Sequence, residues 1–196
     1  VFGFNFFLYY SLKFIVSKIF NQPINSFLKK NNIPNIKLSS SVNSNDSLNK
    51  IKSFKPDLLV SILGNQIFKR ELLDLAPKGC INLHTALLPK YRGLMPTFWV
   101  MKNNEKYTGV SVFFVDEGID SGPIIVQEKV QIANLTQAQL IKQTKKIGME
   151  LIVKAVKLIS EDNLILIPNP ESEKTYYSFP TRNDVIEFNK NGKKFF

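Results

Sequence analysis

Residues 79–93 read GCINLHTALLPKYRG, and they contain the pattern that decides the fold: an apolar strand that ends on polar side chains. We expect the strand over Cys80 to His84, with His84, the only histidine of the 196 residues, at its carboxyl end. Side chains two positions apart on a strand point to the same face. Asn82 and His84 are therefore predicted to face one site.

Apolar segments before and after this strand predict a sheet with helices between its strands. Further strands are expected over 57–63, 109–115 and 124–130, with a short helix over 68–75. The branched residues of 57–63 are typical of a strand covered on both faces. A long helix is predicted after Thr136, which forms a capping-box pattern with Gln139. Its apolar positions are Leu140, Ile147, Leu151, Ala155 and Ile159. This alternation predicts an α/β fold with a mostly parallel sheet flanked by helices.

Composition indicates a globular protein, with 44% hydrophobic and 21% charged residues. The net charge of +10 could steer an anionic partner such as a tRNA or a nucleotide-sugar. Because the lysines are scattered, we prefer a solvated basic surface as the explanation. The single cysteine, Cys80, excludes an internal disulfide, fits a reducing cytoplasmic compartment and is expected to be a small buried filler. With one histidine and one cysteine, we expect no metal site.

The most hydrophobic segment of the chain is residues 1–20. Asn5, Lys13 and Lys18 interrupt it, so a membrane span is not favoured. Our first interpretation is a helix packed on the sheet, and membrane contact through residues 1–20 is the second.

A loop rich in glycine and acid, 116–123, joins two predicted strands and brings Asp120 toward the same edge of the sheet. An asparagine amide, an imidazole and a carboxylate can together stabilise an oxyanion and move a proton. This set is suited to acyl transfer onto a nucleophile that the substrate itself carries. On spacing alone, a strand histidine and an Asp-Gly turn are more often structural.

Several separated motifs change that balance, and through them the chain resembles the folate-dependent formyltransferases. This family includes methionyl-tRNA, glycinamide ribonucleotide and amino-sugar formyltransferases. The motifs are Asn82-Leu83-His84, Leu87-Leu88-Pro89-Lys90-Tyr91-Arg92-Gly93, Gly109-Val110-Ser111-Val112 and Asp120-Ser121-Gly122-Pro123-Ile124-Ile125. The resemblance runs from about Lys55 to Ser160. It implies a Rossmann-like catalytic domain that transfers a formyl group from 10-formyltetrahydrofolate to a primary amine, without a metal.

The resemblance also assigns roles to residues. Asn82, His84 and Asp120 match the family's catalytic trio. Two loops that match the pterin-binding loops contain Leu63, Asn65, Gln66, Ile67 and Phe68 in the first and Val115, Asp116, Glu117 and Gly118 in the second. Lys90, Arg92 and Gly93 are expected to meet the acceptor, with surface charge an open alternative for Lys90 and Arg92.

Departures from the family pattern affect the acceptor assignment. Ala86 stands where the family often has a serine. No first strand of the family's domain is recognisable, so we expect the start of the domain to be missing. We interpret 1–196 as a single catalytic domain in which 161–196 form a tail packed on the core. The 36 residues after Ser160 are too few for a separate tRNA-holding domain. The acceptor is then methionyl-tRNA or an amino-sugar nucleotide, and the alternative is a non-catalytic folate-binding or membrane-associated relative.

Overall fold

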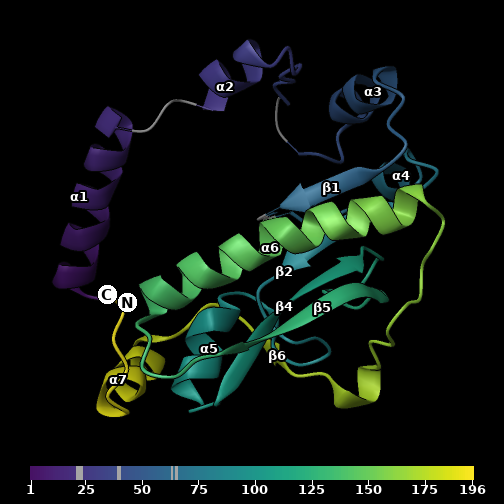
Figure 1. Cartoon of the computed structure of the whole chain (residues 1–196). Coiled ribbons are helices and arrows are strands. Elements are labelled where there is room, and N and C mark those ends of the chain that lie inside the picture. The colour runs from purple at the N-terminus through teal and green to yellow at the C-terminus, as the bar shows by residue number, and fades with distance from the viewer. Residues whose placement is uncertain (21–23, 39–40, 63, 65) are drawn as a thin grey trace.

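The fold is a four-stranded sheet crossed by one long helix (Figure 1). The computed structural model describes residues 1–20, 24–38, 41–62, 64 and 66–196. The helices are α1 (Phe4–Phe20), α2 (Ile24–Lys30), α3 (Asn45–Ser53), α4 (Arg70–Leu73), α5 (Pro96–Lys102), α6 (Gln137–Ser160) and α7 (Arg182–Lys190), with one 3-10 turn, η1 (Glu171–Glu173). The strands are β1 (Leu59–Ile62), β2 (Cys80–His84), β3 (Arg92–Gly93), β4 (Tyr107–Phe114), β5 (Ile124–Gln131) and β6 (Tyr176–Tyr177).

The main sheet has the strand order β1-β2-β4-β5, and β3 pairs with β6 in a separate two-stranded sheet. β1–β2 and β3–β6 are parallel pairs, whereas β2–β4 and β4–β5 are antiparallel. The loop 115–123 is too short for a crossover between parallel strands, so β4 and β5 form a hairpin. The predicted α/β class with flanking helices is confirmed, and the main sheet is mixed because the chain reverses direction after β2.

The long helix α6 lies across one face of β2, β4 and β5 (Figure 1). Thr136 and Gln139 form the predicted capping box, in which each side chain bonds the backbone N–H of the other. The predicted apolar stripe is confirmed: Leu140, Ala155 and Ile159 are buried in the core cluster with strand residues. This burial, more than helix propensity, stabilises the helix.

The edge strand β1 differs from its prediction. Its side chains alternate between half-buried and exposed, and Val60 and Ile62 are each 43% exposed. The expectation that both faces are covered is wrong, because one face of this edge strand is open to solvent. The branched residues of 57–63 predicted a strand, and the strand is present.

The segment 1–20 forms the predicted helix, but this helix does not pack on the sheet (Figure 1). Instead Phe2 and Phe6 contact the ring of Phe195 edge-on, with centroids 5.7 and 5.3 Å away. Most other apolar side chains described in α1 are exposed, Phe4 and Phe7 among them. No helix in the described ranges has the length and apolar character to cross a membrane.

The C-terminal segment returns to the core. The rings of Phe98 in α5 and Phe188 in α7 stack with centroids 4.9 Å apart, and Phe195 stacks on Phe188 at 4.6 Å. Earlier in this segment, Ile167 bridges to Ile124 at the start of β5. Residues 167–177 therefore contact first the start of β5 and then β3, with which β6 pairs, before the chain reaches α7.

Candidate active site

Asn82 and His84 lie on β2, an interior strand of the sheet. In the pairing with β4, Asn82 is opposite Phe113 and His84 is opposite Ser111. The side-chain oxygen Oδ1 of Asn82 is buried and accepts no hydrogen bond from the described part of the chain. Buried polar atoms are nearly always paired in folded proteins. This unpaired acceptor is therefore available to a hydrogen-bond donor on a ligand.

The imidazole of His84 is only 6% exposed, and each ring nitrogen faces a different oxygen. Nε2 lies 2.7 Å from the main-chain oxygen of Tyr91, and Nδ1 lies 3.5 Å from Oδ2 of Asp120. A carbonyl oxygen can only accept, so Nε2 must carry the hydrogen. The neutral ring then presents the lone pair of Nδ1 toward Asp120, and the protonated ring presents an N–H there. Nδ1 is consequently the position where a proton can be gained or lost.

Asp120 reaches this position from the loop between β4 and β5. Its backbone has the left-handed φ of +49°, which turns the carboxylate back toward β2. Oδ2 also accepts a 2.8 Å hydrogen bond from the N–H of Gly93. A side chain at Gly122 would place its Cβ 1.8 Å from the oxygen of Phe114, so only glycine allows the turn to lie this close to β4.

A cavity of about 450 Å³ lies beside these side chains. Asn82 and Asp120 line this cavity. His84 is not among the lining residues but contacts Asp120, which is. Its other walls come from β1, the loop after it, the β4–β5 loop and the C-terminal segment. The lining side chains and backbone belong to Ser61, Gly64, Gln66, Ile67, Phe68, Gly93, Leu94, Phe113, Val115, Asp116, Gly118, Ile119 and Tyr176. The structure thus brings the predicted trio together at one ligand-sized hollow.

Most residues predicted for the folate loops line this cavity. From the first loop these are Gln66, Ile67 and Phe68, and from the second Val115, Asp116 and Gly118. Leu63 and Asn65 lie outside the described residues. Glu117 lines a neighbouring cavity instead.

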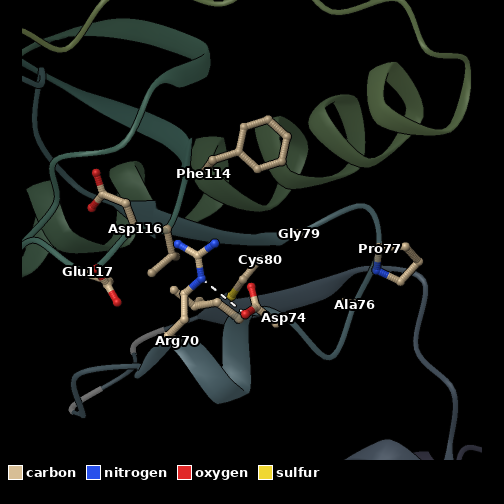
Figure 2. Close-up of a pocket in the computed structure, with 11 residues that line it drawn as sticks. Arg70, Asp74, Ala76, Pro77, Gly79, Cys80, Phe114, Asp116 and Glu117 are labelled. Atoms are coloured by element: carbon tan, nitrogen blue, oxygen red, sulfur yellow. Dashed lines mark hydrogen bonds and ion pairs between the residues drawn. The ribbon is translucent and has the colours of Figure 1, made fainter.

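That neighbouring cavity, of about 480 Å³, is drawn in Figure 2. Arg70 lies between Asp74, to which its Nε bonds at 3.1 Å, and the loop that carries Asp116 and Glu117. Cys80 is at its base, and burial raises the pKa of this thiol to about 11. Cys80 is therefore the protonated, unreactive filler predicted from the sequence. In the described ranges, no three His, Cys, Asp or Glu side chains are grouped as metal ligands.

The three residues predicted to meet the acceptor lie in three different places. Gly93 lines the main cavity. Lys90 is exposed beside a separate hollow near Glu105. Arg92 is 3% exposed, and its guanidinium donates to Glu171 and to Asn169. In this structure Arg92 therefore binds the protein itself, because its charge is neutralised and enclosed by the C-terminal segment.

The loop that follows His84 is held by Ser111, to which the sequence analysis assigned no role, and by Gln127, which it did not name. Ser111 Oγ donates to the oxygen of Ala86 at 2.6 Å and accepts from the N–H of Leu88 at 3.2 Å. Gln127 Nε2 donates to Ser111 Oγ at 2.8 Å and to the oxygen of Leu88 at 3.0 Å. The loop is therefore held by these hydrogen bonds even though residue 86 is alanine and has no hydroxyl group.

Two further residues at the site come from the C-terminal segment. Tyr176 lines the cavity and is 53% exposed. Asn169 bonds the backbone of the turn that carries Asp120. Neither had a signal in the sequence, because their roles depend on contacts across more than forty positions.

Comparison with known proteins shows the family of the chain. A family model described as formyl transferase matches residues 16–156. The chain belongs to the formyl transferase family. The four sequence motifs between Asn82 and Ile125 all lie within the matched range.

Curated relatives in this family include methionyl-tRNA formyltransferases from two bacteria. The one from Kosmotoga olearia is 35% identical, over 91% of this chain and 58% of its own. The one from Acetivibrio thermocellus is also 35% identical, over 79% of this chain and 50% of its own. This chain therefore spans about half the length of the formyl transferases it matches by sequence.

Solved structures with a similar fold include formyltransferases. A 4-N formyltransferase from Francisella tularensis has a TM-score of 0.65 and 26% identity, covering 85% of this chain and 72% of its own. An N-formyltransferase from Helicobacter canadensis, in complex with folinic acid and dTDP-3-aminofucose, has a TM-score of 0.62 and 24% identity, covering 81% and 54%. These likenesses agree with the Rossmann-like fold expected for the family.

Proposed function

We propose that this chain transfers the formyl group of 10-formyltetrahydrofolate to the primary amine of methionyl-tRNA or of an amino-sugar nucleotide. The observation that carries the proposal is the convergence of Asn82, His84 and Asp120 on one cavity of about 450 Å³. Membership of the formyl transferase family supports the reaction, and the relatives' names supply the two candidate acceptors.

The donor's pterin ring would occupy the part of the cavity between the loops at 66–68 and 115–118. Ile67, Phe68 and Val115 offer apolar surface for its faces. Flat heteroaromatic rings bind well between apolar walls when a few polar groups read their edge. The first loop is already anchored, because Asn43 Nδ2 donates to the oxygen of Ile67 at 2.8 Å. A loop held in this way before binding loses little conformational freedom when the ring enters.

The acceptor amine would approach from the side lined by Gly93, Leu94 and Tyr176. The lining residues of the cavity include two aspartates, Asp116 and Asp120, and among those described no lysine or arginine. This acidic lining attracts an alkylammonium group and repels phosphate. The phosphates of either acceptor would therefore remain outside the cavity.

The reaction then follows from these groups. The neutral amine attacks the formyl carbon, and the carbonyl oxygen becomes an oxyanion that the side-chain N–H of Asn82 can stabilise, while His84 acts through Asp120, which lies between it and the cavity. Asp120 holds the imidazole and receives the proton that the amine nitrogen loses. The bond from the formyl carbon to N10 breaks, and N10 takes as it leaves the proton that Asp120 received, which restores the carboxylate. The products are tetrahydrofolate and a formamide on the acceptor.

A direct transfer assay tests this proposal. The chain is incubated with 10-formyltetrahydrofolate and one acceptor in each reaction. The acceptors are charged initiator tRNA and a panel of nucleotide-linked amino sugars. Mass spectrometry measures the formylated product and absorbance measures released tetrahydrofolate. We expect transfer to one class of acceptor, and His84→Ala should abolish that transfer while the chain remains folded. Asn163→Ala, in the exposed turn after α6, is the matched control.

Two outcomes would contradict the proposal. Wild-type rates in His84→Ala would remove the imidazole from the mechanism. Folate binding without transfer to any acceptor would favour the alternative function, a binding protein that retains the pocket.

A further inference from the structure

The turn that carries Asp120 is tied to the C-terminal segment through Asn169. The Nδ2 of Asn169 donates to the main-chain oxygens of Asp120 and Gly122, at 2.9 and 2.8 Å. An amide nitrogen has two hydrogens, so both are used on this one turn. Asp120 adopts a left-handed backbone conformation, which costs free energy in a non-glycine residue and which hydrogen bonds from the surroundings can stabilise. Asn169 supplies two bonds that do so.

Arg92 determines which way the amide of Asn169 points. Its Nη2 donates to Asn169 Oδ1 at 2.9 Å and to the main-chain oxygen of Asn169 at 3.1 Å. A guanidinium only donates, so the amide oxygen must face Arg92 and the amide nitrogen must face the turn. Arg92 Nη1 pairs with Glu171 in the same segment, which fixes the guanidinium plane.

These contacts close a ring of bonds around the carboxylate. Gly93, the residue after Arg92, donates its N–H to Asp120 Oδ2 at 2.8 Å. On the other side, Arg92 N and Leu94 N donate to the oxygens of Thr175 and Tyr177, each at 2.9 Å. The Asp120 turn and the Arg92–Gly93 strand are thus both anchored on residues 169–177.

We propose that Asn169 is a positioning residue for Asp120 and that Arg92 acts through Asn169 and not on the acceptor. The kinetic consequence rests on the proposed function, since it concerns transfer between folate and amine. Asp120 Oδ2 is 3.5 Å from His84 Nδ1, a distance at which a small displacement makes or loses the contact. A misplacement of about 1 Å in a catalytic group can lower a rate by about 100-fold.

The first test compares Asn169→Ala with Asn163→Ala, the same change in an exposed turn of the same segment. We expect Asn169→Ala to lower kcat by about 10- to 100-fold while KM for 10-formyltetrahydrofolate changes less than about 3-fold. Asn163→Ala should change neither. A kcat equal to that of the wild type, or a KM that rises as much as kcat falls, would overturn the proposal.

A second measurement needs no activity, because His84 is the only histidine. In protein labelled with ¹⁵N-histidine, one pair of ring resonances reports on the Nδ1 that faces Asp120 and the Nε2 that faces Tyr91. Asn169→Ala should shift the Nδ1 resonance and leave Nε2 nearly unchanged. Identical spectra would overturn the positioning role, even if the wild-type chain transferred no formyl group.

A double variant tests whether Arg92 acts through Asn169. Arg92→Lys keeps the charge but loses the planar fork that holds the amide. Alone, it should lower kcat in the same direction as Asn169→Ala. Combined with Asn169→Ala it should add less than about 2-fold, because the residue it orients is already gone. A fully multiplicative loss would show an independent role for Arg92 and overturn that part of the proposal.

Discussion

Replacing Asp120 by asparagine removes one charge from the site and nearly nothing else. The side chain keeps its shape, and an amide oxygen at the place of Oδ2 can still accept from the N–H of Gly93, now 2.8 Å away. What is lost is the negative charge 3.5 Å from His84 Nδ1 and the ability to receive a proton. The variant therefore separates the chemical role of the carboxylate from its part in holding the turn.

The expected magnitudes differ for the two roles. A positioned acid or base contributes about 10²- to 10⁴-fold to a rate, so kcat should fall by that factor, or about 3–5 kcal/mol in the activation free energy. Exchanging a charged for a neutral hydrogen bond changes the free energy of unfolding by about 1 kcal/mol. For a chain of this size that is a shift of about 2–4 °C in Tm. Activity should thus fall far more than stability.

The assay measures kcat and KM for formyl transfer, the dissociation constant for tetrahydrofolate and Tm. Asp162→Asn is the matched control, because Asp162 has the same left-handed φ of +49° in a turn that is exposed beside Lys78. We expect the control to retain wild-type kinetics. A tetrahydrofolate affinity that falls as much as kcat in Asp120→Asn would refute the reasoning, since Asp120 would then be a binding residue only.

Two structural features give further predictions. Gly93 has φ +94° and its added Cβ would lie 2.3 Å from the oxygen of Tyr177, so Gly93→Ala should lower the free energy of unfolding by about 2–4 kcal/mol in chemical denaturation. Gly192→Ala, at φ +71° with nothing within 4 Å, should lower it by only about 1 kcal/mol, and equal losses would contradict the close approach. Cys80, with a pKa raised to about 11, should react with a thiol reagent at pH 8 only after denaturant is added. The thiol of the unfolded chain ionises near pH 8.5, so the contribution of the protonated Cys80 thiol to stability is complete below that pH and is lost as the pH rises toward 11. Cys80→Ala should therefore flatten the plot of Tm against pH in this range. A plot unchanged by the substitution would argue against the raised pKa.

Local sequence patterns were sufficient for the elements that frame the site. The apolar run from Cys80 to His84 predicted β2 with its observed bounds, and Thr136 with Gln139 predicted the start of α6. Such patterns succeed because strand alternation and helix capping depend on neighbouring residues. The trio of Asn82, His84 and Asp120 was proposed from short motifs, but the argument that their strand ends share one edge of the sheet was wrong. β4 runs antiparallel to β2, so its last residue, Phe114, lies opposite Ile81 and not beside His84. Asp120 comes within 3.5 Å of His84 because the loop after β4 folds back.

Local patterns failed where a residue's partner lies far along the chain. The sequence of residues 1–20 predicted a helix. That Phe2 and Phe6 contact Phe195, and that the helix does not pack on the sheet, depends on a tertiary contact between segments far apart in the sequence. Arg92 had the chemistry of an acceptor-binding residue, and the sequence alone did not indicate that Glu171 and Asn169 enclose it. The sequence around Ala86 likewise did not predict which residues hydrogen-bond the loop. In the structure these residues are Ser111 and Gln127.

The sequence by itself predicted which side chains are candidates for acyl transfer, and it predicted the strand and the loop that carry them. The tertiary structure decided how they are held, because that depends on contacts between residues 49 and 77 positions apart, such as Asn169 with Asp120 and Arg92 with Asn169. A hydrogen bond over such a separation forms only after the intervening chain has been ordered by burial of its own apolar side chains. No local pattern encodes it, since the same residues without that packing would be solvated polar side chains.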